Sequence, residues 1–438
     1  MLRFALLLLA MGASAQDLRL QYTSAIDNSQ QPYRLYIPAK HATPAPLVIA
    51  MHGTGGNEAT LFEQHATLKQ AADLHGMMVV SPNGRGVTEY RGIGENDVLA
   101  VLADVRRKYA IDPERIYLTG HSMGGTGAAY LAMRHPDIFA AAAPLAAAYS
   151  YPWLARNLVS VPTLWIAGAA DDEFYHRGVA VGVERIRKFG GRAILESLPG
   201  EGHNGPVKDF GRVFAWLANY KRDPHPRRFV YETDTPLHGC AFWTCLQTFL
   251  RPGQMATIVA EGAGGNRINM TLSNVAEFTF VPDSTFLDTT KSVSLAVNGN
   301  LIWSAPIPLD QQLRITHGWT ASLEPLAARG LEWRTHPVAQ APRQLDMQGV
   351  QKPLGSWIAD AMRAATGTEI ALYGGWAYRG LPIPEGTVDA VDLLQCSRPF
   401  DQLLITVDLT GLEIAQILDD NVPHLKKDQP MRIDSPGA

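Results

Sequence analysis

Apolar runs alternate with amphipathic stretches along the first half of the chain. Residues 47–51 and 116–120 are mainly apolar runs bounded by polar positions, a pattern typical of strands buried on both faces. Between them, residues 96–109 place apolar side chains at helical spacing, with Asn96 or Asp97 as the predicted N-cap. The alternation predicts a doubly wound, mostly parallel sheet covered by helices on both faces. Further strands are predicted at residues 34–38, 77–81, 164–168 and 193–196.

The pattern changes after residues 221–228, a polar, proline-broken segment typical of a linker. From there to about residue 308 the apolar runs are short and separated by turn residues, which predicts a small β-sandwich. Asn298-Gly299 is expected to form a hairpin turn. Residues 262–265 are glycine-rich but no helix follows them, so we interpret them as a turn and not as a dinucleotide-binding loop.

A third pattern begins near residue 337. It predicts helices over 357–365 and 411–418 and a strand over 403–407. The hydropathy pattern therefore predicts a domain with a doubly wound α/β sheet, a β-sandwich-like domain and a C-terminal α+β domain. Their predicted bounds are residues 16–222, 228–336 and 345–438, respectively.

The first fifteen residues have the three parts of a secretory signal. A single basic residue, Arg3, precedes the apolar run 4–11, and Ala13-Ser14-Ala15 then supplies small residues for cleavage near Ala15. The apolar run is too short to span a bilayer, which takes about 20 residues. We expect an exported protein, secreted or periplasmic, without membrane insertion.

Composition narrows the classes of partner. With 46% hydrophobic and 18% charged residues among 438, the chain has ample material for packed cores. A net charge of −4 without any Lys/Arg block excludes the usual basic surface for nucleic acid. The three cysteines are too few for a disulfide scaffold; a bridge between Cys240 and Cys245 is left open, and Cys396 is expected to be a small buried apolar residue. Cys and His spacing predicts no metal site.

One motif carries chemistry. Gly120-His121-Ser122-Met123-Gly124 fits G-x-S-x-G, follows the predicted strand directly, and precedes a small-residue segment compatible with a helix. A nucleophile on such a sharp turn needs small neighbours, and its hydroxyl is exposed at the carboxyl edge of the sheet. The context predicts Ser122 as a nucleophile.

A serine hydroxyl needs a base, and in this arrangement the acid and then the histidine follow in the chain. A buried strand ends in a glycine turn just before Asp171, and a glycine-rich loop after the next strand presents His203. We expect His203 to act as general base and then acid, and Asp171 to orient it. Asp172 is the competing acid, although the spacing after Gly168 favours Asp171.

The oxyanion formed during attack needs fixed donors. We expect the backbone N–H of Met123 and that of Thr54, in the His-Gly-rich loop 51–56 after an earlier buried strand. The remaining histidines have no companion pattern and are expected to be mostly solvated; they include His65, His75, His135 and His176.

These residues resemble an α/β-hydrolase, and more narrowly the secreted esterases related to polyhydroxybutyrate depolymerases and feruloyl or acetylxylan esterases. The resemblance covers about residues 31–217. It is carried by the nucleophile elbow, which is the turn formed by the motif at residues 120–124, and by residues 34–38, 51–53, 109–117 and 135–141. It implies hydrolysis of carboxylic esters through an acyl-enzyme, without a metal or other cofactor. Prolyl-oligopeptidase-like peptidases share much of the pattern, so amide hydrolysis stays an alternative, although no propeller-type repeats precede the motif.

The segment between residues 145 and 161 is short where many relatives insert a helical lid, which favours an open cleft and a bulky or polymeric ester. Tyr149, Tyr151 and Trp153 either pack on substrate or cover the sheet edge. An extracellular polyester and an acylated plant polysaccharide are both compatible substrates. The sequence predicts no oligomeric state.

From about residue 345 the chain resembles the C-terminal domain of secreted 5′-nucleotidases, chiefly at residues 352–363 and 397–402. The resemblance implies nucleoside binding, but the family's metallophosphatase patterns are missing from the sequence. The family's nucleotide loop corresponds to residues 374–379, where bulky Trp376 and Tyr378 would crowd a nucleotide. We interpret this tail as a repurposed or vestigial module and expect the domain to be cut short.

The leading interpretation is a secreted serine carboxylesterase. A serine peptidase of the same fold and a non-catalytic binding protein that attaches through the sandwich and the tail are the alternatives. A nucleotidase is disfavoured by the missing metal ligands.

Overall fold

The computed structural model describes residues 14–326, 337–341, 353–368 and 386–389, and the single residues 370, 410 and 414. These residues fall into two compact units: one holds the α/β sheet and the sandwich, and the other holds the elements beyond residue 330 together with residues 25–28 and 91–96. The predicted signal up to residue 13, the strand at 403–407 and nearly all of the helix at 411–418 lie outside the described residues.

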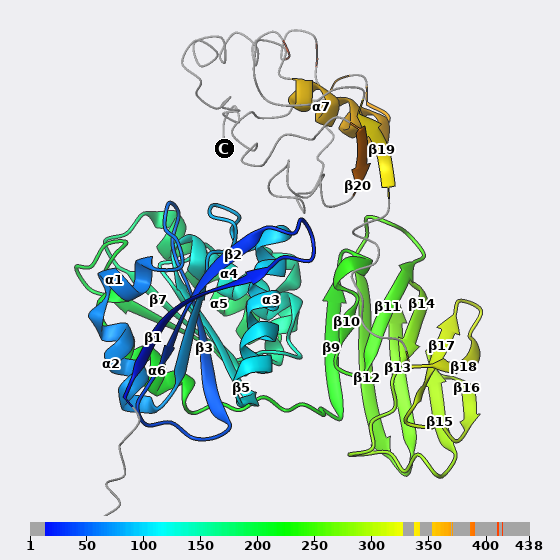
Figure 1. The fold of residues 1–438 in the computed structure, drawn as a ribbon. Helices are drawn as coiled ribbons and strands as arrows, with labels where there is room; N and C mark the ends of the chain where they lie inside the picture. Colours follow the sequence, from blue (N-terminus) through cyan, green and yellow to red (C-terminus); the bar gives the residue numbers. More distant parts are fainter. Residues whose placement is uncertain are drawn as a thin grey trace, which may run out of the picture. The chain divides into compact units, whose positions relative to one another are not determined.

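Eight strands form one sheet in the order β1-β2-β4-β3-β5-β6-β7-β8 (Figure 1). Neighbouring strands from β4 to β8 in this order are parallel, while β2 runs antiparallel to both β1 and β4. This mostly parallel sheet confirms the α/β-hydrolase fold class predicted from the sequence. The strands are β1 (Gln16–Thr23), β2 (Gln30–Ile37), β3 (Ala45–Met51), β4 (Met78–Pro82), β5 (Ile111–His121), β6 (Ala141–Leu145), β7 (Thr163–Gly168) and β8 (Ala193–Leu198).

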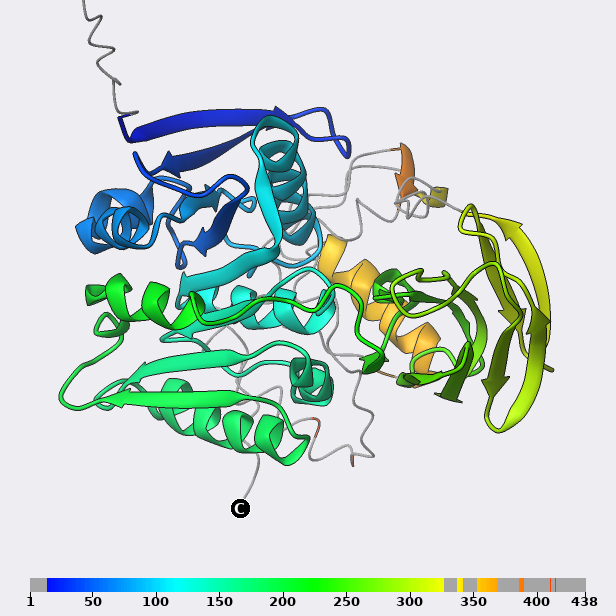
Figure 2. The same ribbon diagram turned by 90° about the horizontal axis from the view of Figure 1, so that it is seen from below.

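Helices cover both faces of this sheet, as Figure 2 shows from below. One buried cluster joins the sheet to α3, α4, α5 and the 3₁₀ helix η1, and a second joins it to α1, α2 and α6. A further 3₁₀ turn, η2, lies before α6. The helices are α1 (Thr60–Gln64), α2 (Ala66–His75), α3 (Ile93–Lys108), α4 (Met123–Arg134), η1 (Pro152–Val159), α5 (Glu173–Lys188), η2 (Pro206–Lys208) and α6 (Phe210–Leu217).

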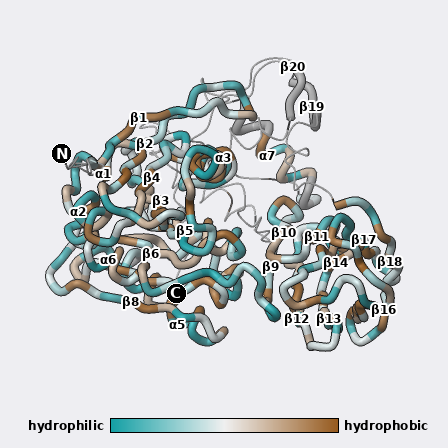
Figure 3. The backbone as a smooth tube through the Cα atoms, turned by 60° about the horizontal axis from the view of Figure 1, so that its bottom comes forward, coloured by the Kyte–Doolittle hydropathy of each residue, from teal (hydrophilic) through white to brown (hydrophobic). Residues whose placement is uncertain are grey.

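The predicted start of α3 is wrong. The helix begins at Ile93, and the N–H of Asn96 donates to the carbonyl of Gly92, so Asn96 lies in the first turn and is not the cap. The prediction started from the apolar stripe that begins at Val98, whereas the first turn of the helix is buried through Ile93 and the polar residues Glu95 and Asn96. Figure 3, which views α3 along its axis, shows apolar and polar residues at different positions around it.

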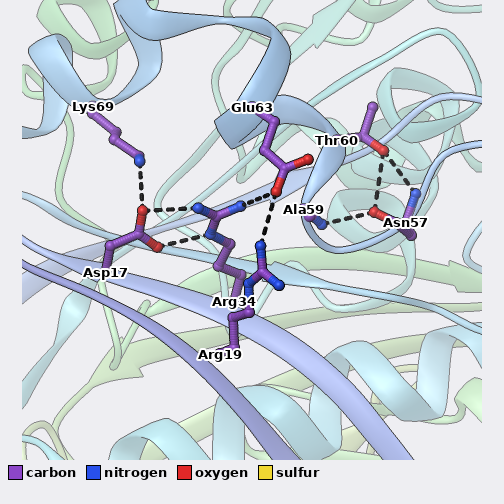
Figure 4. Close-up of polar contacts among 8 residues, drawn as sticks. All are labelled: Asp17, Arg19, Arg34, Asn57, Ala59, Thr60, Glu63 and Lys69. Carbon is purple, nitrogen blue, oxygen red and sulfur yellow. Dashed lines mark hydrogen bonds and ion pairs between the residues drawn. The ribbon is translucent and has the colours of Figure 1, made fainter.

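The N-terminal hairpin is fastened to the helical layer by charged groups (Figure 4). The guanidinium of Arg34 on β2, only 9% exposed, binds both carboxylate oxygens of Asp17 on β1 and reaches Glu63 on α1 at 3.0 Å. Hydrogen bonds from Arg34 hold the pKa of the Asp17 carboxyl below its usual range, against the effect of burial. These contacts tie β1 and β2 to α1, the helix that follows β3.

Two five-stranded sheets form the β-sandwich, in the orders β10-β11-β14-β17-β18 and β16-β15-β13-β12-β9. Strand β13 alternates buried and exposed residues along its whole length, because one face turns to the shared core. The sandwich elements are β9 (Arg228–Thr233), η3 (Pro236–His238), β10 (Cys240–Ala241), β11 (Thr244–Phe249), β12 (Ala256–Gly264), β13 (Arg267–Ser273), β14 (Val275–Phe280), β15 (Val293–Val297), β16 (Asn300–Ala305), β17 (Gln311–Thr316) and β18 (Thr320–Pro325).

The structure of the sandwich tests two predicted turns and the bridge between Cys240 and Cys245 that the sequence left undecided. Asn298 and Gly299, both with positive φ, form a two-residue turn between β15 and β16, as predicted. The glycine-rich residues 262–265 lie at the end of the β12–β13 hairpin, with no helix after them. Cys240 and Cys245 face each other on β10 and β11 and form a disulfide.

In the second unit, α7 (Pro353–Thr366) contains the helix predicted at 357–365. A short antiparallel pair joins β19 (Pro337–Ala341) and β20 (Gly386–Asp389). Among the described residues, none of the helices is both long and apolar enough to cross a membrane.

Buried polar groups join the sandwich to the α/β sheet's helices. Arg134, the last residue of α4, has a fully buried side chain that donates to Asp234 just after β9 at 2.6 Å and 3.3 Å. Trp153 on η1 donates its indole N–H to the same carboxylate at 3.1 Å. The buried amide of Asn157 accepts from the N–H of Glu232 and donates to its carbonyl, so η1 also holds the backbone of β9.

We expect Asp234→Ala to lower the free energy of unfolding by about 2 to 3 kcal/mol, because it leaves the buried Arg134 without its carboxylate. Denaturant unfolding followed by both fluorescence and circular dichroism measures this. As a control, Glu184→Ala removes an exposed pair with Arg187 and is expected to change the free energy by no more than about 0.5 kcal/mol. Equal losses in the two variants would contradict the structural role of the buried pair.

The same pair predicts a pH dependence. Burial alone would raise the pKa of the Asp234 carboxyl, but the charge and hydrogen bonds of Arg134 hold it below the ordinary value of 3.8. A carboxyl whose pKa is lower in the folded than in the unfolded state stabilises the fold at pH values above its unfolded-state pKa. This stabilisation is lost as the pH falls through the folded-state pKa. The difference in stability between wild type and Asp234→Ala should therefore shrink below about pH 4. A difference that stays constant down to pH 2.5 would contradict this.

Candidate active site

Ser122 occupies a strained turn between β5 and α4. Its backbone has φ 56° and ψ −116°, a region that non-glycine residues rarely adopt, and its N–H donates to the carbonyl of Leu145 at the end of β6. A Cβ at Gly124 would lie 2.1 Å from the carbonyl oxygen of Met51, and one at Gly120 would lie 2.5 Å from that of Gly124. The two motif glycines are therefore required by close packing of α4 against β3 and β5.

The structure brings Ser122, His203 and Asp171 into one hydrogen-bonded series. Nε2 of His203 lies 2.9 Å from Oγ of Ser122, and Nδ1 of His203 lies 2.8 Å from Oδ2 of Asp171. These three residues lie 32 to 81 positions apart in the chain. The arrangement has the geometry in which a histidine can remove a hydroxyl proton while a carboxylate orients it.

Asp171 is the carboxylate that meets His203. Its side chain is only 5% exposed, and its other oxygen, Oδ1, accepts the backbone N–H of Asp172 at 2.8 Å. Asp172 itself is exposed, at the start of α5. The acid that the spacing favoured is thus the one whose carboxylate lies beside the imidazole.

Adjacent parallel strands position this acid and histidine. β7 and β8 pair in register, so the loops after them leave from the same edge of the sheet. The N–H of Ala170 donates to the carbonyl of Glu201, and a Cβ at Gly168 would lie 2.3 Å from the carbonyl oxygens of both Glu201 and Gly202. Gly168 is therefore needed for the two loops to approach.

The predicted oxyanion loop lies against the nucleophile. A Cβ at Gly53 would be 3.5 Å from Cβ of Ser122, and a turn closed from Gly56 N–H to Gly53 carbonyl leaves Thr54 exposed at its tip. Asn57 then accepts the N–H of Ala59 and donates its own N–H to Thr60, which anchors the loop to α1 (Figure 4).

Met123 is the first residue of α4, where backbone N–H groups have no partner within the helix. The donor roles of Thr54 and Met123 stay predictions.

Two side chains beside His203 were given no role by the sequence analysis. His121, the variable residue before Ser122, has Nε2 3.0 Å from the backbone carbonyl of His203, with ring centroids 5.1 Å apart. Tyr175 on α5 has its ring centroid 4.6 Å from that of His203. The G-x-S-x-G motif specifies only its glycines and serine, and no sequence pattern indicates that the His203 loop returns to β5. The one signal that could have pointed to His121 was its position next to Ser122.

The three aromatic residues of residues 145–161 pack within the protein. Tyr151, only 4% exposed, lies between the rings of Tyr130 and Trp153, at 5.1 Å and 5.3 Å. The ring of Tyr149 contacts Trp165, and burial raises its pKa to about 12. Of the two roles left open, these contacts favour covering the sheet.

The expectation that the remaining histidines are mostly solvated holds for His41, His225 and His317, which are exposed, but not for His65, His75, His135 and His176. These four side chains are half-buried. Three of them pack against neighbours that the sequence pattern did not reveal. The rings of His65 and His75 lie near Phe210 and Phe214 of α6, and His176 contacts the hydroxyl of Ser197 at 2.9 Å.

Two family models match parts of the chain. Residues 24–182 match the family model described as "Putative esterase". The chain contains an esterase-family domain. Residues 335–433 match the 5′-nucleotidase C-terminal domain. His203 lies beyond the matched esterase segment, and the tail segments 374–379 and 397–402, like Cys396, lie outside the described residues.

Curated relatives of the esterase-family domain include three esterases. "Putative esterase NocK" of Nocardia uniformis is 34% identical over 32% of this chain and 44% of its own length. Feruloyl esterase B of Neurospora crassa is 27% identical over 38% and 56%, and poly(3-hydroxyalkanoate) depolymerase C of Paucimonas lemoignei is 29% identical over 25% and 30%. The chain therefore spans about half the length of these relatives or less. The predicted resemblances, to esterases and to the 5′-nucleotidase C-terminal domain, are both confirmed.

The close packing at the nucleophile elbow predicts the effect of a substitution at Gly124. Gly124→Ala would place a Cβ on the carbonyl of Met51, so we expect at least about 3 kcal/mol of destabilisation. The matched control is Gly178→Ala in α5, where a Cβ meets nothing within 4 Å and should stabilise the helix by about 0.5 to 1 kcal/mol. Thermal unfolding of both variants measures the two signs; a neutral Gly124→Ala would contradict the close packing.

Proposed function

We propose that the protein is a secreted serine carboxylesterase in which Ser122 is the nucleophile, His203 the general base and acid, and Asp171 the orienting carboxylate. The observation that carries the proposal is the hydrogen-bonded series from Oγ of Ser122 through His203 to Asp171, at 2.9 Å and 2.8 Å. The esterase-family match of residues 24–182 supports it. Secretion rests on the predicted signal alone.

In the proposed reaction, Nε2 of His203 removes the hydroxyl proton as Oγ of Ser122 bonds to the ester carbonyl carbon. The backbone N–H groups of Thr54 and Met123 stabilise the negative oxygen of the tetrahedral intermediate. The C–O bond to the alcohol then breaks, and His203 returns its proton to the departing oxygen. Water repeats the sequence on the acyl-serine, releasing the acid and restoring the hydroxyl.

We propose an acylated polysaccharide or a polyhydroxyalkanoate as the substrate class. The support is the short segment 145–161, whose 3₁₀ helix η1 packs into the buried cluster beside the sheet, and the names of two relatives, a feruloyl esterase and a poly(3-hydroxyalkanoate) depolymerase. We also propose that residues 16–222, 228–336 and 345–438 are a catalytic and two accessory domains.

Ser122→Ala is expected to lower kcat on p-nitrophenyl butyrate by about 10⁶-fold, because it removes the nucleophile. Labelling by a fluorophosphonate probe should also be lost. Ser160→Ala, at an exposed position after η1, serves as the control and should keep both. Undiminished turnover in a folded Ser122→Ala protein would end the assignment.

Asp171→Asn should lower kcat by roughly 10³- to 10⁴-fold, because the amide no longer stabilises the imidazolium of His203. Asp172→Asn, one position away and exposed, should stay within about threefold of wild type, because Asp171 and not Asp172 lies beside the imidazole of His203. Steady-state kinetics on the same ester compares the two. The reverse ranking would make Asp172 the orienting acid.

A substrate panel tests the class. Polyhydroxybutyrate, methyl ferulate, acetylated xylan and peptide anilides should be compared by kcat/KM, and we expect one of the three esters to lead. An anilide turned over faster than every ester would favour the peptidase. A folded protein that neither hydrolyses these compounds nor reacts with fluorophosphonate would favour the binding protein.

A further inference from the structure

We propose that His121 is a positioning residue that holds the catalytic-histidine loop against the nucleophile elbow. The proposal rests on the proposed function, since it concerns how His203 is presented to Ser122. Three observations carry it: the hydrogen bond from His121 to the backbone of His203, the contact between the two rings, and the packing of His121 against Gly53 of the predicted oxyanion loop.

The hydrogen bond joins two segments that the chain keeps far apart. Nε2 of His121, the last residue of β5, donates to the carbonyl oxygen of His203 at 3.0 Å, across 82 positions of sequence. This contact reaches the backbone of His203, whereas Ser122 and Asp171 reach only its imidazole. The side chain of His203 is thus oriented by Asp171, and its main chain is fixed by His121.

The surroundings of His203 make this contact important. The residue lies in a loop between β8 and η2. The nearest backbone bonds close small turns, from Glu201 to Leu198 and from Gly205 to Gly202, and one bond, from Ala170 to the carbonyl of Glu201, joins the start of the loop to the loop after β7. Gly200 and Gly202, with no Cβ contact within 4 Å, leave the loop backbone conformational freedom. A fixed carbonyl at His203 reduces that freedom at the residue whose Nε2 must meet Oγ of Ser122.

His121 also borders the oxyanion side of the site. A Cβ at Gly53 would lie 3.4 Å from Nδ1 of His121 and 3.3 Å from its carbonyl oxygen. Gly53 therefore lies close to His121, with space for little more than a methyl group between them. One residue, directly before the nucleophile, contacts both the loop that supplies the base and the loop predicted to supply an oxyanion donor.

The protonation state fits this role. Burial lowers the pKa of His121, and the nearby His203 and His65 lower it further, so the ring is neutral near pH 7; the hydrogen bond to His203 and the charge of Asp171 oppose the shift only in part. Because a carbonyl can only accept, Nε2 carries the proton and Nδ1 is the bare nitrogen. A neutral ring avoids a second positive charge 5.1 Å from the imidazolium that forms during attack.

The test compares two amides at position 121. In His121→Gln the side-chain nitrogen reaches about as far as Nε2 and can still donate to the His203 carbonyl, whereas in His121→Asn it reaches only as far as Nδ1. We expect Gln to stay within about threefold of wild-type kcat on p-nitrophenyl butyrate, and Asn to lose about 10- to 100-fold with KM within about threefold. Rates are normalised to sites titrated with fluorophosphonate, so a loss of folded protein does not enter them.

The labelling rate of Ser122 by fluorophosphonate gives a second readout and should follow the same order. The paired variants His176→Gln and His176→Asn are the control, since His176 also uses Nε2 for a hydrogen bond, but to Ser197 on β8. Both should match wild type. Equal rates for His121→Asn and wild type, or equal losses in the Gln and Asn variants, would overturn the proposal. A wild-type protein that neither labels nor hydrolyses esters would instead overturn the proposed function.

Discussion

The closest packing in the esterase-family domain is the approach of α4 to β3 and β5, and the rest of the site depends on it. The packed backbone leaves no space for a side chain at Gly120 or Gly124. The chain turns sharply between them, and Ser122 is held in a strained backbone conformation. A hydrogen bond from Ser122 to Leu145 fixes the turn to the neighbouring strand β6. The strain is therefore stabilised by the surrounding sheet and not by the turn itself.

Because the turn lies at the carboxyl edge of parallel strands, other loops arrive at the same place. The loop after β3 brings Gly53 to the nucleophile, and the loops after β7 and β8 bring Asp171 and His203. Gly168 lets the last two loops touch. Each of these approaches has a glycine at the point of contact, so the motif glycines and the loop glycines are needed for the same reason: a side chain there would separate the packed segments.

The helix that starts at the nucleophile ends at the sandwich. α4 spans twelve residues from Met123 to Arg134, and its last side chain is buried against Asp234. η1 adds Trp153 and Asn157 to the same contact with β9. The sandwich is thereby part of the packing around α4, and a change at this junction reaches the helix that carries the elbow.

The sequence by itself determined the sheet class, the sandwich and the Asn298-Gly299 turn, and it named Ser122, His203 and Asp171, with Asp172 as the competing acid. It could do so because continuous apolar runs, alternating runs and glycine-bounded motifs are local signals. It did not determine the start of α3 or the half-buried histidines, since these depend on what packs against them. Only the tertiary structure decided that Cys240 is bonded to Cys245, that Asp171 lies beside His203, and that His121 holds the His203 loop. Such contacts join residues through the adjacency of strands, and no local pattern of side chains encodes which loops a sheet edge will bring together.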